Sequence, residues 1–200
     1  MSLAFAKAGA SAIAIGARSD MASLEQEIHN AATKAGKQQP RVLQVKLDVT
    51  SRDSVRSAAE AVEKDFGKLD IVINNAGILG ERSPVADSDP DDWWNMWTIN
   101  MRGPYLVTRA FLPLLLKGGD KTIVNVSSVV AHLKSPGLSA YGTAKLALLR
   151  FTEFLCAEYG DKGLLGYCIH PGNVLTDLSG DVPEELKRTG MSILLDILFT

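Results

Sequence analysis

The sequence predicts an α/β fold in which a doubly wound parallel sheet is covered by helices on both faces. Short β-branched or apolar runs alternate along the chain with longer segments of helical periodicity. The apolar runs are nearly continuous, as strands buried on both faces require, and polar motifs follow three of them. No internal repeat or Pro/Gly-rich linker interrupts this alternation.

Each element is placed by its own pattern and by the residues that bound it. Gly9 and Gly36 fall where helices are expected to stop, and Asp91 and Ser139 fall where helices are expected to begin. The expected strands, in chain order, are Ala12–Gly16, Val42–Leu47, Leu69–Asn74, Thr122–Ser127 and Leu165–His170. The expected helices are Met21–Ala35, Ser51–Phe66, Asp91–Leu116 and Ser139–Tyr159.

Composition and charge limit the class of protein. With 200 residues, 46% of them hydrophobic and 22% charged, the chain can bury a core and is expected to form one domain over residues 1–200. The net charge is −2 and no basic run occurs, so no nucleic acid or anionic membrane is expected as a partner. The apolar ends are too short for a signal peptide or a membrane span, so we expect a soluble, cytoplasmic protein.

The two cysteines indicate the redox environment. Cys156 and Cys168 match no metal-binding or redox spacing, and they are expected to be buried thiols in a reducing compartment. No metal site is expected.

The segment from Tyr141 to Lys145, with Ser128 thirteen positions upstream, carries the main chemical signal. On a helix, residues four apart share one face, so Lys145 would lie one turn beyond Tyr141 and could favour ionisation of its phenol. A free tyrosine ionises near pH ~10 and needs such help to transfer protons at neutral pH. Ser128 adds a hydroxyl, so that a phenol, an ammonium and a hydroxyl would lie within reach of one substrate carbonyl. Taken alone, Tyr141 and Lys145 fit an ordinary surface pair better than a catalytic pair.

Ligands of open parallel sheets bind at the carboxyl ends of the strands, where this chain carries three polar motifs. After the third strand come small residues and amides, Asn74-Asn75-Ala76-Gly77, which would let the backbone approach a flat ligand. At the end of the fourth comes Asn125-Val126-Ser127-Ser128. After the fifth comes a rigid turn that starts at Pro171-Gly172 and leaves Thr176 free to hydrogen-bond. The three motifs together predict a binding site at this edge of the sheet.

In the order of these motifs the chain resembles the classical short-chain dehydrogenase/reductase family, from about residue 4 to residue 177. The resemblance implies a Rossmann-like fold and NAD(P)-dependent alcohol oxidation or carbonyl reduction of a small molecule. It implies that Tyr141 donates or accepts the proton at the substrate oxygen and that Ser128 hydrogen-bonds that oxygen. It implies that Lys145 lowers the pKa of Tyr141 and holds the nicotinamide ribose. Asn100 would keep a water that links Lys145 to a proton relay, and Ser127 is the less favoured serine because the family's interval fits Ser128.

The resemblance also assigns cofactor contacts. Where NAD-selective sites carry an acid at the end of the second strand, this chain has Ala17 followed by Arg18, which favours NADP, with NAD as the alternative. The pair Asp48 and Val49 resembles the family's adenine-binding pair. The further cofactor-binding residues implied are Asn75, Ala76, Gly77, Tyr141, Lys145, Pro171, Gly172, Val174 and Thr176. By the same resemblance, the helices Asp91–Leu116 and Ser139–Tyr159 imply a homodimer or tetramer.

Several of these residues have simpler interpretations. Arg18 could be a solvated loop charge, and Asp48 could cap the helix that begins after Thr50. His170 with Asp177 and a serine suggests a hydrolase triad, but no Gly-x-Ser-x-Gly segment accompanies them. The three tryptophans between residues 93 and 97 are more simply explained by packing or a subunit contact than by ligand stacking.

The chain also departs from the family pattern. The family begins with a strand and a Thr-Gly-x-x-x-Gly-x-Gly loop that brings the pyrophosphate to a helix N-terminus. This sequence contains neither, and its first segment, Ser2–Ala8, resembles the end of the helix that follows that loop. In the strand order 3-2-1-4-5-6 the missing strand is central, so we expect the sheet to separate into two parts. A C-terminal strand is also expected to be absent. Two hypotheses follow: the family activity, or a truncated, non-catalytic remnant that acts at most as a dimerisation or binding partner.

Overall fold

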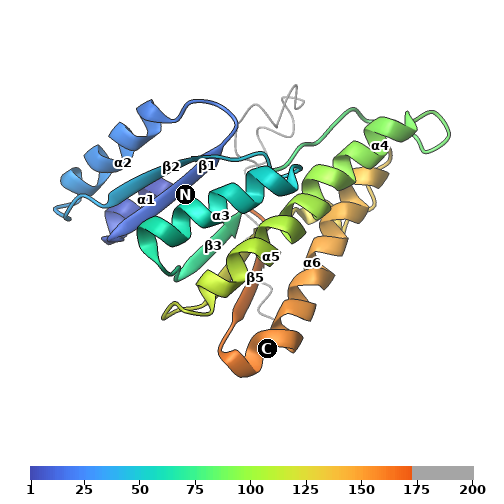
Figure 1. The fold of residues 1–200 in the computed structure, drawn as a ribbon. Coiled ribbons are helices and arrows are strands. Elements are labelled where there is room, and N and C mark those ends of the chain that lie inside the picture. The colour runs from blue at the N-terminus through green and yellow to red at the C-terminus, as the bar shows by residue number, and fades with distance from the viewer. Residues whose placement is uncertain (173–200) are drawn as a thin grey trace. The chain divides into compact units, whose positions relative to one another are not determined.

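The computed structural model describes residues 1–172, and they fall into two compact units, Met1–Lys68 and the residues from Leu69 onward. Each unit contains parallel strands and helices, so the predicted α/β class is confirmed (Figure 1). The expectation of one domain over residues 1–200 stays a prediction. Among the described helices, none combines the length and apolarity needed to cross a bilayer.

The first unit is a two-stranded sheet with three helices. Strand β1 (Ala12–Ala17) pairs in parallel with β2 (Arg41–Lys46), in a register that sets Ala17 opposite Lys46. The helices are α1 (Ser2–Ala8), α2 (Ala22–Lys34) and α3 (Arg52–Phe66). One apolar core joins α1, β1 and α2, and its buried members are Ala6, Ile15, Met21, Ile28, Ala31 and Ala32.

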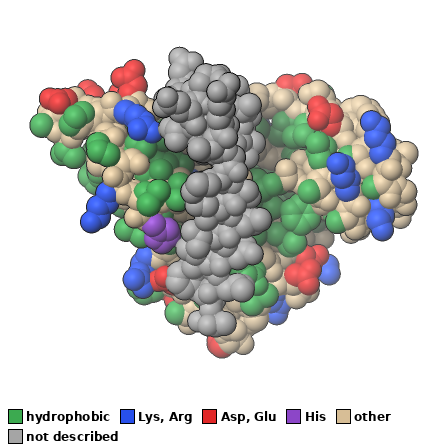
Figure 2. All heavy atoms as spheres, turned by 180° about the vertical axis from the view of Figure 1, so that it is seen from behind, with side chains coloured by type: hydrophobic (Ala, Val, Ile, Leu, Met, Phe, Trp, Pro, Cys, Tyr) green, Lys and Arg blue, Asp and Glu red, His purple; other side chains and the backbone are tan. Residues whose placement is uncertain are grey.

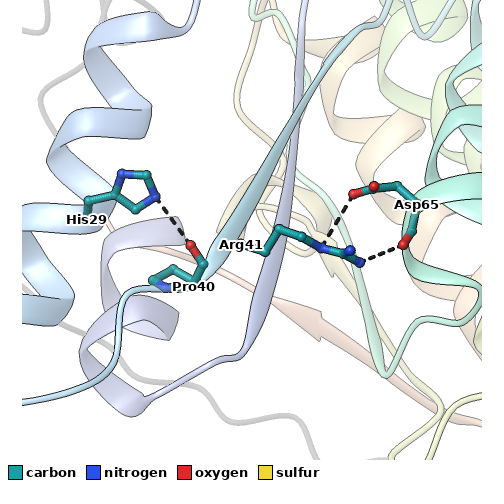
Figure 3. Close-up of polar contacts among 4 residues, drawn as sticks. All are labelled: His29, Pro40, Arg41 and Asp65. Atoms are coloured by element: carbon teal, nitrogen blue, oxygen red, sulfur yellow. Dashed lines mark hydrogen bonds and ion pairs between the residues drawn. The ribbon is translucent and has the colours of Figure 1, made fainter.

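Local signals explain where these helices end and how the strand ends are held. Helix α1 stops at Gly9, whose φ of 94° is the left-handed conformation that glycine adopts without strain. Arg41 at the start of β2 is held by Asp65, whose backbone oxygen accepts from Nη2 at 2.6 Å and whose Oδ2 lies 3.5 Å from Nε (Figure 3). In the same view His29 Nε2 lies 3.2 Å from the Pro40 oxygen, which ties α2 to the residue before β2.

The second unit is a three-stranded parallel sheet in the order β3-β4-β5. The strands are β3 (Ile71–Asn74), β4 (Thr122–Val126) and β5 (Leu165–Ile169). Helix α5 (Gly103–Leu115) packs on β3, and helix α6 (Ser139–Tyr159) packs on β5. Helix α6 has the predicted bounds, and every strand end lies within two residues of its predicted position.

The expectation of one unbroken helix over Asp91–Leu116 is wrong. The structure has α4 (Pro90–Trp97), a π-helical turn (Thr98–Arg102) and then α5. Pro104 explains the irregularity, because it has no N–H to donate to the Asn100 carbonyl four residues earlier. The start of α4 also differs by one residue, since the Asp89 carboxylate caps it by accepting from the backbone N–H groups of Asp91 and Asp92.

Among residues 1–172 the strands form two separate sheets, β1-β2 and β3-β4-β5. This is the separation that the missing central strand predicts. The further prediction about a C-terminal strand concerns residues outside the described part. On the face drawn in Figure 2, basic and acidic side chains both occur among apolar ones.

Candidate functional site

Tyr141 and Lys145 lie one turn apart on α6, and both are buried, with exposed fractions of 7% and 5%. Tyr141 shares a small apolar cluster with Met96 and Ala140, against which Ile78 packs. The simpler interpretation of the two residues as a surface pair is therefore wrong. Burial of a lysine ammonium requires polar partners, so the surroundings of Lys145 indicate how the site is organised.

The Lys145 ammonium is held at the end of strand β4. Its Nζ donates to the backbone oxygen of Val126 at 2.8 Å and lies 5.6 Å from the centre of the Tyr141 ring. Burial lowers the pKa of Lys145 from 10.5 to about 8, and the nearby Cys168 side chain acts in the opposite direction. Lys145 is thus a cation at neutral pH but close enough to its pKa to lose the proton in mild alkali.

The phenol of Tyr141 shows an effect that the sequence did not predict. Burial raises the pKa of Tyr141 above its ordinary value of 10.0, and a hydrogen bond with Ser128 acts against this rise. The expected lowering of the pKa of Tyr141 by Lys145 is not the net result in this structure. The phenol is therefore protonated at neutral pH, and Ser128 is the hydroxyl group beside it.

Asn100 is fully buried in the π-helical turn and is fixed by the backbone of Ile78. Its Oδ1 accepts from the Ile78 N–H at 3.2 Å, and its Nδ2 donates to the Ile78 oxygen at 2.8 Å. The adjoining Gly77 leaves the space that this contact needs, because a Cβ at position 77 would lie 2.7 Å from Asn100 Oδ1 and 3.5 Å from Lys145 Nζ. The structure thus brings the Asn-Asn-Ala-Gly motif, Asn100 and Lys145 together.

The two serines after β4 contact the same helix at different points. Ser128 is half-buried, accepts from the Val130 N–H at 3.3 Å and is the hydrogen-bond partner of Tyr141. Ser127 is buried, with its Oγ 3.2 Å from the backbone oxygen of Lys145. The side chain that approaches the phenol is that of Ser128.

A buried polar network, which was not predicted from the sequence, links the three strands β3, β4 and β5 to helix α6. Asn74 Nδ2 donates to Asn125 Oδ1 at 2.8 Å, and Asn125 Nδ2 donates to Thr152 Oγ1 at 2.8 Å. Thr152 Oγ1 donates to the Leu148 oxygen at 2.8 Å and lies 3.0 Å from Cys168 Sγ. A usable signal existed in the sequence: an asparagine inside an apolar strand must find a buried partner.

In the first unit, the predicted cofactor residues Arg18 and Asp48 follow neighbouring strands. Arg18 is exposed, and its charge contributes to lowering the pKa of Asp48 below 3.8, after the larger effect of two hydrogen bonds from Thr50. Asp48 accepts from the Thr50 N–H at 2.9 Å and from its hydroxyl at 2.7 Å, while Ser51 caps helix α3. The interpretation of Asp48 as the helix cap is therefore wrong. Val49 beside it is half-buried.

The remaining predicted site residues lie at strand ends or outside the described part. Asn75 and Ala76 are exposed after β3, and Pro171 is exposed after β5. Gly172 has a φ of 78°, a left-handed turn conformation. Val174 and Thr176 fall among residues 173–200, outside the described part.

Other sequence expectations are refined by the structure. Cys156 and Cys168 are free thiols, but both are partly exposed instead of buried. Trp93 and Trp97 stack with ring centres 6.0 Å apart, while Trp94 is 62% exposed. Within residues 1–172, no group of three His, Cys, Asp or Glu side chains is arranged to hold a metal ion.

Comparisons with known proteins agree with this architecture. Residues 1–187 match the family model of the short chain dehydrogenases. The short chain dehydrogenase mpl6 of Monascus purpureus is 52% identical over 185 residues, which are 92% of this chain and 63% of mpl6. The chain thus spans less than two thirds of the length of this relative.

Two solved structures illustrate the fold. The alcohol dehydrogenase of the archaeon Thermococcus sibiricus, complexed with 5-hydroxy-NADP, matches with a TM-score of 0.77 and 27% identity over 91% of this chain and 74% of that one. An NAD+-bound xylitol dehydrogenase matches with a TM-score of 0.72 and 29% identity over 85% of this chain and 63% of that one. One of these proteins carries an NADP derivative and the other carries NAD+.

Proposed function

Because the chain belongs to the short-chain dehydrogenase family, a family of oxidoreductases, we propose that it catalyses NADP-dependent reduction of a small carbonyl compound or oxidation of the corresponding alcohol. The observation that carries this proposal is the buried arrangement of Tyr141, Ser128 and Lys145 around the end of β4. No packing role explains a lysine ammonium buried beside a phenol and a hydroxyl, since an apolar residue would fill the same space at lower cost.

The protonation state of the site supports a role in carbonyl reduction. With its pKa raised by burial, Tyr141 holds its proton at neutral pH and can donate it to an oxyanion that forms on the substrate. The Ser128 hydroxyl, already within hydrogen-bond reach of the phenol, would stabilise that oxyanion. The Lys145 ammonium favours the tyrosinate that remains after the transfer, because its positive charge lies beside the ring.

The residues around Gly77 fit a nicotinamide cofactor in the second unit. Gly77 has no side chain beside Lys145, and Asn75 and Ala76 are exposed at the end of β3, so a flat ligand can approach the backbone there. When bound, the nicotinamide supplies or accepts the hydride. Lys145 would hold its ribose, and Gly77 would leave room for it.

Asn100 is proposed to keep the water that connects Lys145 to solvent. Its side chain is held by Ile78, and its backbone carbonyl lacks the α-helical donor at position 104, because Pro104 has no N–H, so we assign the water to this carbonyl. After Tyr141 gives up its proton, the tyrosinate would regain one from solvent through Lys145 and this water.

The preference for NADP rests on the first unit. Arg18 is exposed directly after β1, and Ala17 stands where an acid would repel a 2′-phosphate. Asp48, a carboxylate with a lowered pKa beside Arg18, and Val49 are proposed to contact the adenine. Asn75, Ala76, Pro171, Gly172, Val174 and Thr176 complete the proposed set of cofactor contacts.

The surroundings of the protein are also part of the proposal. Free cysteines and a sequence without a basic run support a cytoplasmic protein that binds neither nucleic acid nor membrane. A homodimer or tetramer is proposed from α5 and α6, on whose outer faces Tyr105 and Phe154 are 44% and 57% exposed.

A turnover assay with the purified chain tests the function. NADPH oxidation, followed at 340 nm with a panel of aldehydes and ketones, should exceed the rate without carbonyl compound and should stop in Tyr141→Phe. A thermal shift with NADPH should accompany the activity, since a ligand that binds the folded state stabilises it. Absence of both turnover and thermal shift would refute catalysis by this chain and leave the non-catalytic hypothesis.

A further inference from the structure

Three consecutive residues at the end of β4 hold three different atoms of one turn of α6. The backbone oxygen of Val126 accepts from Lys145 Nζ at 2.8 Å, and Ser127 Oγ lies 3.2 Å from the backbone oxygen of Lys145. Ser128, the next residue, is the hydrogen-bond partner of the Tyr141 hydroxyl. The proposed reaction uses Ser128, Tyr141 and Lys145, but it assigns nothing to Ser127.

The direction of the Ser127 hydrogen bond follows from chemistry. A carbonyl oxygen only accepts, so the Ser127 hydroxyl must donate to Lys145. The Lys145 carbonyl lies inside α6, where it also accepts the N–H of Leu149 four residues later. A carbonyl has two lone pairs, so Ser127 uses the second one. Removal of the hydroxyl would leave no buried backbone group without a partner.

Ser127 itself is held rigidly. Its N–H donates to the Ile169 oxygen of β5 at 2.8 Å, and the residue is only 5% exposed. A serine bound to β5 through its backbone and to α6 through its side chain therefore connects the sheet to the helix at the level of Lys145. Two residues earlier, Asn125 makes a comparable connection to Thr152, two turns further along α6.

From this geometry we propose that Ser127 is a positioning residue: its hydroxyl holds the α6 backbone at Lys145, so that the lysine side chain reaches from that backbone to the neighbouring Val126 oxygen. Only the expected effect of Ser127 on turnover rests on the proposed function. The position of Lys145 can be measured without turnover. The titratable groups beside the ammonium are Tyr141 on α6 and Cys168 on β5.

The test is an NMR titration of the Lys145 Nζ resonance in the 15N-lysine-labelled, full 200-residue chain, assigned by its disappearance in Lys145→Arg. In Ser127→Ala the looser helix should admit water to the ammonium, and relief of desolvation should move the Lys145 pKa upward by about half a unit or more, a change of about threefold in proton affinity. Ser127→Thr keeps the hydroxyl and should restore the original titration.

The matched control is Thr143→Ala. Thr143 Oγ1 also bonds to α6 carbonyls, those of Ser139 at 2.5 Å and Ala140 at 3.2 Å, but it is exposed and these bonds stay within its own helix. It should leave the Lys145 titration unchanged. If Ser127→Ala does not fold, Ser127→Cys, with a weaker donor of similar size, replaces it and should shift the pKa in the same direction by less.

An unchanged Lys145 titration in folded Ser127→Ala, or in Ser127→Cys, would overturn the proposal, as would an equal shift in Thr143→Ala. These outcomes are separate from the proposed function, because they need neither cofactor nor substrate. If turnover is observed, the rate at saturating substrate should fall in Ser127→Ala and recover in Ser127→Thr, while the substrate KM stays within about twofold. Slower turnover of Ser127→Ala with an unchanged Lys145 pKa would also contradict the proposal that Ser127 acts through Lys145.

Discussion

Gly77 lies so close to Asn100 that a Cβ at position 77 would come within 2.7 Å of the asparagine Oδ1. The same Cβ would lie 3.5 Å from Lys145 Nζ. Gly77 therefore allows Asn100 to bond both backbone groups of Ile78 while the ammonium stays alongside. This close approach connects the turn after β3 with the π-helical turn and with α6.

Gly77→Ala should therefore destabilise the second unit. Overpacking against a fixed, fully buried side chain typically costs about 1–3 kcal/mol, and the Asn100 contacts with Ile78 should lengthen. Urea unfolding followed by circular dichroism measures the change. Gly160→Ala is the matched control: no atom lies within 4 Å of its Cβ position, and its φ of −63° suits alanine. Equal stabilities of the two variants would contradict the role given to Gly77.

Tyr141→Phe should remove turnover and leave NADPH binding intact. Only the hydroxyl is lost, so the apolar packing on Met96 and Ala140 remains. A general acid typically raises the reaction rate by about 10²–10⁴-fold, and the catalytic rate constant should fall by that factor when it is lost. Stopped-flow turnover and a binding titration with NADPH separate the two effects. Tyr159→Phe, at the far end of the same helix, should have wild-type activity, and substantial activity in Tyr141→Phe would exclude the proposed proton donor.

Lys145→Met should abolish activity while it raises stability at neutral pH. The pKa of Lys145 is lowered from 10.5 to about 8, so the folded state loses the proton more readily than the unfolded state. This difference in the pKa of Lys145 between the unfolded and folded states lowers the free energy of unfolding by about 3 kcal/mol below pH 8. The loss is relieved as the pH rises from 8 toward 10.5.

Urea unfolding at pH 7, 8, 9 and 10 measures this effect. The free energy of unfolding of the wild-type chain should rise relative to that of Lys145→Met across this range, so that the two approach each other at high pH. A constant difference between the two proteins from pH 7 to 10 would show that the pKa of Lys145 is not lowered by folding.

Arg18→Ala should weaken NADPH binding but not NADH binding. A charge-assisted contact to the 2′-phosphate is worth about tenfold or more in affinity, whereas NADH lacks that group. Calorimetric titration with both nucleotides measures the ratio. Arg56→Ala, a change at an exposed arginine on α3, is the control for loss of charge alone. Equal weakening of both nucleotides would argue against recognition of the 2′-phosphate by Arg18.

Thr152→Val should destabilise the second unit by about 2–3 kcal/mol, because it leaves the buried Asn125 amide without its acceptor. Cys168 Sγ, 3.0 Å from the Thr152 hydroxyl oxygen, would lose the same partner. Thr152→Ser keeps the hydroxyl and should retain most of the stability. Chemical denaturation of both variants tests this, and a neutral Thr152→Val would show that the network contributes little.

Much of the fold and of the site follows from local patterns along the chain. Strand and helix limits are set by apolar periodicity and by glycines such as Gly9, so they appear within about two residues of their predicted places. The helical spacing of Tyr141 and Lys145 requires no tertiary information, because residues four apart share one helix face. The separation of the strands into two sheets was predictable from the missing central strand.

Tertiary packing decided what local pattern could not. The fit between Gly77 and Asn100 and the bond between Ser127 and Lys145 each depend on a neighbour distant in sequence. The direction of the Tyr141 pKa shift depends on how deeply packing buries the phenol. Sequence alone determined which chemical groups this protein carries and in what order. Only the tertiary structure decided their burial, and burial sets their protonation because it removes the water that stabilises charge.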